Sequence, residues 1–267
     1  MFEQFAPGVF FPIDSPIHRL RSRTKLLALG WLVGYTTAAN QLGRPVAYAA
    51  LVALALLAAA LSRVGAGQLW RRMRWLALLT LIGTIPGVLL LGVEGDPLVS
   101  LGPIVVTYEA IWLAARLAVS FLALYLLALL LTLTTAPVAL IEGLTMLLKP
   151  LRWLRLPVDA FALMALIALR FIPTLAAELE LLVKAQLARG ADFTHGSLAQ
   201  RRDSLAALVV PAYTGALRRA AELASALDAR GFRADTPPTR LYERPLARAD
   251  YVCLVLVVGI SLAALLV

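Results

Sequence analysis

Two short tripeptides combine a cation with a helix stop. Ala188-Arg189-Gly190 and Ala229-Arg230-Gly231 each follow a stretch in which apolar residues recur at helical spacing. Glycine after the last turn commonly ends a helix, and an arginine in that turn suits the negative end of the helix dipole. A guanidinium held there can also form two parallel hydrogen bonds with a carboxylate. The repeat therefore predicts either two simple caps or two parallel helix termini that dock into acidic pockets of a partner.

Few other residues could perform chemistry. Asp192, His195 and Asp203 lie between the two predicted helices and are the candidates for an integral-membrane enzyme, but they lack the spacing of metal ligands. The single Cys253 excludes a disulfide framework, and with His18 as the only other histidine a multi-histidine metal site is not expected. We predict a non-catalytic chain with no cofactor or metal of its own.

The composition is that of a membrane protein. Of the 267 residues, 61% are hydrophobic and 15% are charged, and the mean hydropathy is +0.82. Soluble domains are usually about 45–50% apolar and about 25% charged. The sequence therefore predicts an all-α polytopic membrane protein rather than a soluble enzyme or a disordered chain.

Five stretches are predicted to cross the bilayer, at residues 24–40, 46–61, 75–93, 109–133 and 251–267. Lys and Arg concentrate before the first stretch and between the second and third, whereas the 94–108 loop has none. The positive-inside rule then predicts a cytoplasmic N-terminus and an external C-terminus. Residues 1–135 and 250–267 form the predicted transmembrane domain, and residues 136–249 form a cytoplasmic domain.

The 136–249 region contains two further apolar stretches, 158–172 and 205–217. We interpret them as parts of two long amphipathic helices at the inner membrane interface, because apolar and charged residues alternate with helical periodicity. A hairpin of two additional membrane helices is the alternative interpretation. In either case, the apolar stripes are expected to pack against each other and against the membrane.

Several motifs resemble those of the transmembrane T-component of energy-coupling factor (ECF) vitamin transporters, and the resemblance covers nearly the whole chain. Residues 14–26, with Arg19, Arg23, Thr24 and Lys25, are similar to the family's opening segment, although Arg21-Ser22 stands where Asp-Pro is usual. Thr134-Thr135-Ala136-Pro137 resembles the turn after the fourth span, and Ala168–Leu175 the start of the family's coupling helices. The stretches Arg189–Phe193 and Ala229–Phe232 resemble its two signatures.

The resemblance implies a division of labour. Two cassette ATPases bind ATP and Mg²⁺, a membrane S-component captures a vitamin or a cobalt or nickel ion, and the T-component couples them in a bacterial or archaeal plasma membrane. The ATPases would bind the two Ala-Arg-Gly ends. The S-component would contact small and apolar positions on the long helices, namely Ala165, Ala168, Ala176, Leu179, Ala212, Ala216 and Ala220. The cargo is not named by this chain, because in the family another polypeptide recognises it.

A secondary transporter is the competing interpretation. Arg116 lies within the fourth predicted span and Glu109 at its outer end, and an ionisable residue in a membrane is a candidate for a solute pathway. We favour a structural role, with Arg116 paired inside the bundle, because no matching acid lies in another predicted span. The chain also lacks the Gly-x-x-x-x-Gly-Lys loop that would bind ATP.

Overall fold

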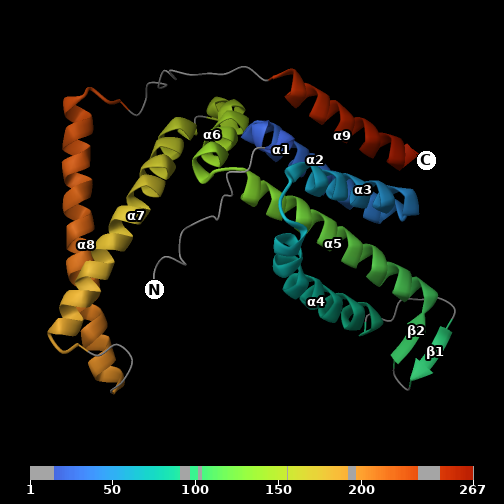
Figure 1. Ribbon diagram of the computed structural model, residues 1–267, viewed down its shortest axis with the longest axis horizontal. Helices are drawn as coiled ribbons and strands as arrows, with labels where there is room; N and C mark the ends of the chain where they lie inside the picture. The colour runs from blue at the N-terminus through green and yellow to red at the C-terminus, as the bar shows by residue number, and fades with distance from the viewer. Residues whose placement is uncertain are drawn as a thin grey trace. The chain divides into compact units, whose positions relative to one another are not determined.

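The computed structural model describes residues 15–90, 97–101, 104–154, 156–191, 197–233 and 247–266. Its helices and strands, shown in Figure 1, are α1 (Pro16–Arg19), α2 (Ser22–Leu42), α3 (Pro45–Ser62), α4 (Ala66–Leu90), β1 (Pro97–Leu101), β2 (Ile104–Thr107), α5 (Tyr108–Thr134), α6 (Pro137–Leu148), the 3₁₀ helix η2 (Lys149–Leu154), α7 (Val158–Ala188), α8 (Leu198–Ala229) and α9 (Arg248–Leu266). The predicted helical fold class is confirmed. A short antiparallel hairpin of β1 and β2, which the sequence analysis did not predict, precedes α5.

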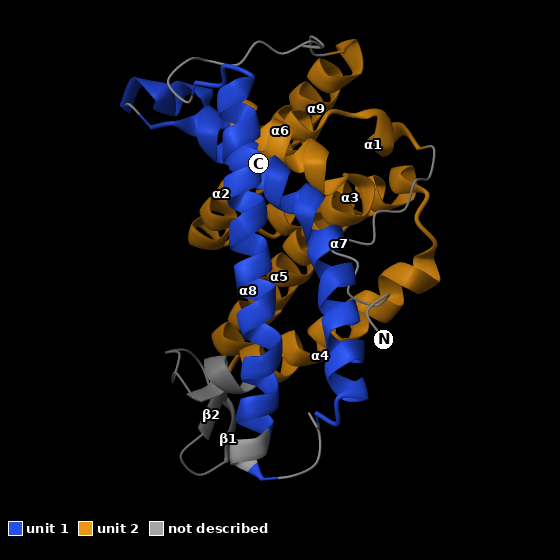
Figure 2. Ribbon diagram, turned by 90° about the vertical axis from the view of Figure 1, so that its left-hand side faces the viewer, with its two compact units in different colours: residues 1–7, 147–242 blue, residues 8–146, 243–267 orange. Residues whose placement is uncertain are grey.

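The chain divides into two compact units (Figure 2). One unit contains η2, α7 and α8 within residues 147–242. The other is formed by residues 8–146 and 243–267, so that the last helix, α9, joins the N-terminal helices.

The larger unit is a helix bundle whose core lies between α2, α3, α5 and α9. Leu32, Leu51, Leu130 and Leu133 are buried there, together with alanines that allow helix backbones to approach closely. Tyr35 donates a hydrogen bond to the Ala47 carbonyl (2.8 Å). Such bonds satisfy the polar tips of aromatic residues in an apolar interior.

All five predicted spans are helical in the described residues, in α2, α3, α4, α5 and α9. By length and hydropathy, however, the described helices that could cross a membrane are α3, α5, α7 and α9. Helix α2 falls outside this group because it contains Arg23, Lys25 and several polar residues. The predicted span in α4 stays untested, because the side chains after residue 84 lie outside the described residues. Helix α7, which we predicted to lie at the interface, meets the criterion, since its first half has few charges.

The smaller unit is an antiparallel pair of long helices. Figures 1 and 2 show α7 and α8 side by side, and Figure 1 shows them running in opposite directions. Each helix contains an internal proline, Pro173 in α7 and Pro211 in α8, and continues beyond it. Their C-terminal ends carry the two Ala-Arg-Gly motifs.

Candidate functional site

The end of α7 is closed by backbone hydrogen bonds alone. Gly190 has a left-handed conformation, with φ +84°, and its N–H donates to the Leu187 carbonyl (3.0 Å). The N–H of Ala191 donates to the Gln186 carbonyl (3.0 Å). This pair of bonds is the Schellman motif, in which glycine is favoured because it has no Cβ.

The end of α8 has the same construction. Gly231 has φ +72°, its N–H donates to the Asp228 carbonyl (2.9 Å), and the N–H of Phe232 donates to the Leu227 carbonyl (3.0 Å). The prediction that glycine stops both helices is confirmed. In both motifs the arginine is the last residue before the glycine, at equivalent positions of equivalent caps.

The two arginine side chains take no part in these caps. Arg189 and Arg230 are both exposed. Neither forms an ion pair or a side-chain hydrogen bond with any residue in the described parts of the chain. Because backbone bonds complete each cap, both guanidinium groups are available to an external partner.

A polar joint connects α7 and α8. The Arg219 Nη2 lies 2.8 Å from the Glu178 Oε2, and both side chains are about 30% exposed. Gly215 lies on the same side of α8, where an added Cβ would be 3.4 Å from the Glu178 Oε1. Farther along the pair, the Gln186 side chain donates to the Ala207 carbonyl (3.2 Å). We call Glu178, Gly215 and Arg219 the helix joint.

The helix joint is equally distant in sequence from the two motifs. Arg189 follows Glu178 by eleven residues, and Arg230 follows Arg219 by eleven residues. At 1.5 Å per residue, each guanidinium-bearing end is about 16 Å from the joint along its own helix. Because the helices are antiparallel, these ends point in opposite directions. The expectation of parallel termini was therefore wrong, and one partner surface would not cover both motifs.

The apolar face of α8 points away from α7. Leu205, Val209, Tyr213 and Leu217 follow one another at i, i+4 spacing and are 51–63% exposed. We call these four residues the α8 stripe. The expectation that the apolar stripes of α7 and α8 pack on each other is not met by Val209, Tyr213 and Leu217, whereas Leu175, Leu182 and Ala216 of the same stripes are partly covered. Contiguous exposed apolar surface of this kind marks an interaction site or a membrane contact.

The predicted S-component contacts differ in exposure. Ala168, Leu179 and Ala220 are exposed, whereas Ala165, Ala176, Ala212 and Ala216 are partly covered. Ala212 and Ala216 flank Gly215 on α8 and lie nearer the helix joint than the stripe does. The larger exposed side chains of the α8 stripe were not among the predicted contacts, although their four-residue spacing was visible in the sequence.

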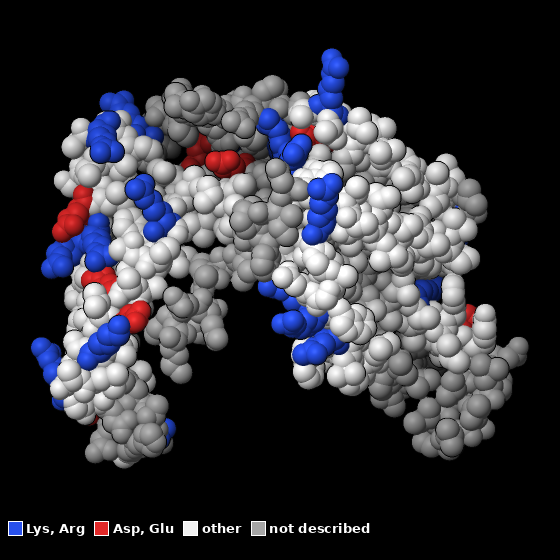
Figure 3. Space-filling model, in the orientation of Figure 1, with Lys and Arg blue, Asp and Glu red and all other residues white. Residues whose placement is uncertain are grey.

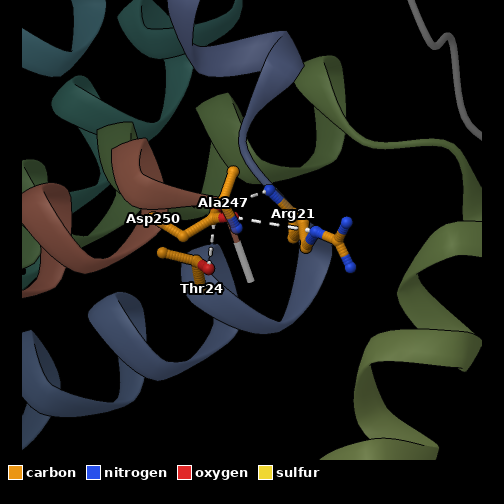
Figure 4. A network of polar contacts seen from close by, with 4 residues as sticks. All are labelled: Arg21, Thr24, Ala247 and Asp250. Atoms are coloured by element: carbon orange, nitrogen blue, oxygen red, sulfur yellow. Dashed lines mark hydrogen bonds and ion pairs between the residues drawn. The ribbon is translucent and has the colours of Figure 1, made fainter. Parts of the chain in front are cut away.

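In the larger unit, a buried carboxylate ties together two distant segments, as Figure 4 shows. Asp250, in the first turn of α9, is 1% exposed. Its Oδ1 accepts hydrogen bonds from the Arg21 N–H (3.0 Å) and the Thr24 hydroxyl (3.0 Å), and its Oδ2 accepts from the Ala247 N–H (2.9 Å). The Arg21 Nε lies 3.7 Å from Oδ2. We call this network the N-terminal clamp; sequence analysis missed Asp250.

Lys25, one turn beyond Arg21 in the same opening segment, has a different partner. Its Nζ donates to the Thr134 carbonyl (2.9 Å) and to the Thr135 hydroxyl (3.0 Å), at the end of α5. Two of the motifs singled out in the sequence therefore meet at one end of the bundle. The contacts of Asp250 and Lys25 connect α2, α5 and α9. They provide hydrogen-bond partners for polar groups inside the bundle and do not form a reaction centre.

The candidates for other activities do not come together in a site. The Arg116 side chain lies near Tyr48 and Gly43 and forms no ion pair with an acid in the described residues. Glu109 is exposed in the first turn of α5. Asp203 is paired with Arg202 on the surface of α8 (3.6 Å), while Asp192 and His195 lie outside the described residues. No cluster of three metal-binding side chains is found within the described ranges.

Comparison with known proteins gives a consistent result. A family described as "Cobalt transport protein" (CbiQ) matches residues 14–240. The chain is 39% identical over 266 residues to the "Energy-coupling factor transporter transmembrane protein EcfT" of Heliobacterium modesticaldum, covering 97% of this chain and 96% of the relative. Proteins with the same description from Limosilactobacillus fermentum (37% over 255 residues, 95% and 94%) and Bacillus subtilis (36% over 269 residues, 100% and 98%) are also similar.

Proposed function

The chain belongs to the CbiQ family, as an EcfT-like transmembrane component of energy-coupling factor transporters, and from this we propose that it couples ATP hydrolysis to movement of a substrate-binding subunit. Two cassette ATPases would bind and hydrolyse ATP with Mg²⁺. A membrane S-component would carry the vitamin, or the cobalt or nickel ion. This chain would transmit force between them without catalysing a reaction.

The two identical helix ends are the observation that carries this proposal. Each ends in a complete backbone cap with an exposed arginine that has no ion-pair partner among the described residues, and the two ends lie on opposite sides of the helix joint. Two copies of a similar ATPase would present two similar binding surfaces, and two equivalent arginines on opposite sides of the helix joint would match that arrangement. A guanidinium is suited to this role because it binds a carboxylate through two parallel hydrogen bonds.

The exposed apolar surface supports contact with a membrane partner. The α8 stripe presents large apolar side chains, and the small residues Ala216 and Ala220 lie beside it. Small residues allow a neighbouring helix to approach closely and to slide with little interlocking. We propose that the S-component occupies this surface, and that Ala165, Ala168, Ala176, Leu179 and Ala212 contribute to it.

The orientation in the membrane is part of the proposal. The loops rich in Arg and Lys would face the cytoplasm, where ATP and the ATPases are located. The N-terminus and the α7–α8 unit would then be cytoplasmic, and α9 would end outside. The match between the 168–175 and 189–193 segments and the family favours a module shared by several S-components.

Replacing the two arginines tests the proposal. If the arginine only places a positive charge near the C-terminal end of the helix dipole, it stabilises the helix by about 0.3–1 kcal/mol, and Lys would serve as well as Arg. Losing one partner of a desolvated ion pair costs about 2–5 kcal/mol, and Lys cannot supply the planar pair of donors. We therefore expect Arg189→Lys and Arg230→Lys each to impair ATP-driven uptake. The double change Arg189→Glu/Arg230→Glu should release both ATPases during affinity purification.

Arg202→Glu is the matched control, because Arg202 is also an exposed arginine of α8 but stands near its other end. It should retain the ATPases and support uptake. Retention of both ATPases and of transport by the Arg189→Glu/Arg230→Glu variant would refute the coupling role of the motifs. Loss of ATPase binding in the control alone would place the docking surface near the start of α8.

A further inference from the structure

A basic and aromatic surface lies where α3 ends and α4 begins. Arg63, Arg71, Arg72 and Arg74 are all exposed there, and Trp70 and Trp75 are 69% and 68% exposed. The Arg74 guanidinium lies 5.6 Å from the Trp75 ring centre. We call these six residues the Arg/Trp surface. Figure 3 shows Lys and Arg side chains gathered over the first turns of α4.

The opposite side of the same turns is anchored in the bundle. Val64 and Leu69 are buried in the hydrophobic core, and Met73 packs against it. Leu69 and Met73 are four residues apart and share one face of α4, so Trp70, Arg71 and Arg74 are turned outward. The start of α4 is therefore amphipathic, and its buried side fixes the exposed side to the bundle.

The conformation of Arg63 is the least expected feature. It ends α3 with φ +54°, whereas the other described residues with positive φ are Gly43, Gly190 and Gly231. A left-handed residue with a Cβ costs about 1–2 kcal/mol, and glycine would avoid that cost. Strain that is retained at one position suggests a function for the side chain that is held there.

The arginines of this surface have no acidic partner in the described residues, and the sequence has no Asp or Glu anywhere between residues 15 and 93. Their charge is therefore not neutralised within this part of the chain. Exposed tryptophans flanking such cations are typical of the membrane–water interface, where the indole ring lies among headgroups.

We propose that the Arg/Trp surface binds the headgroups of anionic phospholipids. Arginine forms two parallel hydrogen bonds with phosphate, and a cluster of cations next to a membrane helix attracts anionic lipid. The tryptophans hold the turn at headgroup depth while the arginines contact phosphate. The binding is a property of this chain alone and does not depend on the ATPases or on the role of Arg189 and Arg230.

The test measures lipid binding to the purified full-length chain. The detergent-solubilised protein is titrated with dioleoyl phosphatidylglycerol or dioleoyl phosphatidylcholine, and retained lipids are counted by native mass spectrometry. We expect phosphatidylglycerol to bind more tightly, and this preference to fall as NaCl is raised from 50 to 500 mM. Each Arg→Gln change at 71, 72 and 74 should weaken phosphatidylglycerol binding about fivefold at low salt, which corresponds to about 1 kcal/mol per cation.

Two further variants distinguish lipid binding by the Arg/Trp surface from a general effect of the protein's net charge. Arg201→Gln/Arg202→Gln/Arg218→Gln removes the same charge from α8 and should keep the lipid preference. Arg71→Lys/Arg72→Lys/Arg74→Lys keeps the positive charge and should retain most of the preference for phosphatidylglycerol. An unchanged preference in the Arg71→Gln/Arg72→Gln/Arg74→Gln protein, or an equal loss in the α8 control, would overturn the proposal. Because Arg71, Arg72 and Arg74 are exposed and Arg201 is the only partly covered residue of the α8 control, a folding defect is not expected from these triple changes.

Discussion

The ion pair of the helix joint offers the sharpest test of how the two arginine ends are positioned. Reversing one charge, in Glu178→Arg, places two guanidinium groups where the structure has a contact of 2.8 Å. Two unit charges about 4 Å apart interact by about 4 kcal/mol at an effective dielectric constant of about 20. Both side chains are about 30% exposed, so solvent screening lowers the net contribution of the native pair to about 1 kcal/mol.

Loss of this attraction together with the new repulsion gives an expected penalty of about 2 kcal/mol, which is a factor of about 30 in the equilibrium between docked and separated helices. The assay is a distance measurement between spin labels at Leu187→Cys and Ala226→Cys, in a Cys253→Ser background, with the ATPases bound. These positions are nine and seven residues from the joint, or about 24 Å apart along the two helices. The native pair should give one narrow distribution and Glu178→Arg a broad one.

The charge swap Glu178→Arg/Arg219→Glu should restore both the narrow distribution and the number of transport cycles per ATP hydrolysed. Glu180→Arg is the matched control on the same helix, because Glu180 pairs only with exposed Lys184 (2.9 Å). It should leave the distribution unchanged. If Glu178→Arg kept the native distribution, or if the swap failed to restore it, the ion pair would not determine how α7 and α8 cross.

Three further predictions follow from the two units. Asp250→Ala should lower the thermal unfolding midpoint markedly, because the donors of Arg21, Thr24 and Ala247 lose their acceptor at a cost of about 1–3 kcal/mol each. Thr24→Val removes one of these hydrogen bonds and should cost about 1 kcal/mol. Equal unfolding midpoints for the two variants would contradict the assignment of Asp250 as the centre of the N-terminal clamp. Cysteines introduced at positions 70 and 96 should react with an impermeant reagent in intact cells only at 96, and the reverse labelling would invert the proposed topology. Ala216→Trp and Ala220→Trp should weaken S-component capture while ATPase binding is kept, and normal capture by both would locate the contact elsewhere.

Local features were predictable from the sequence because their causes are local. Helices α3, α5 and α9 follow from long apolar runs, and both helix ends follow from a single glycine whose backbone can adopt positive φ. The availability of Arg189 and Arg230 was also open to prediction, since the Schellman bonds use backbone groups only. These inferences needed no knowledge of what lies beside each helix.

Long-range partners were not predictable in the same way. Asp250 and Arg21 are separated by 229 positions, and nothing in the spacing of residues near either one identifies the other. The relative direction of the two long helices was also missed, because the sequence shows no pairing such as that between Glu178 and Arg219 that would orient one helix against the other. An acidic residue in the first turn of the last helix, where it suits the helix dipole, is the signal that would have drawn attention to Asp250.

Part of the apolar surface of α8 is left exposed within the described α7–α8 unit. Helices of a soluble protein bury their apolar faces against each other, and burying one large apolar side chain contributes about 1.5–3 kcal/mol. Here Arg219 of α8 pairs with Glu178 of α7 and the Gln186 side chain donates to the Ala207 carbonyl, while Leu205, Val209, Tyr213 and Leu217 remain exposed. An apolar surface laid over the α8 stripe would therefore add the burial of four large side chains to what the α7–α8 contact itself provides. If α8 carries the S-component as proposed, a partly exposed ion pair at the helix joint beside an apolar stripe would let the angle between α7 and α8 change while the S-component stays on the stripe.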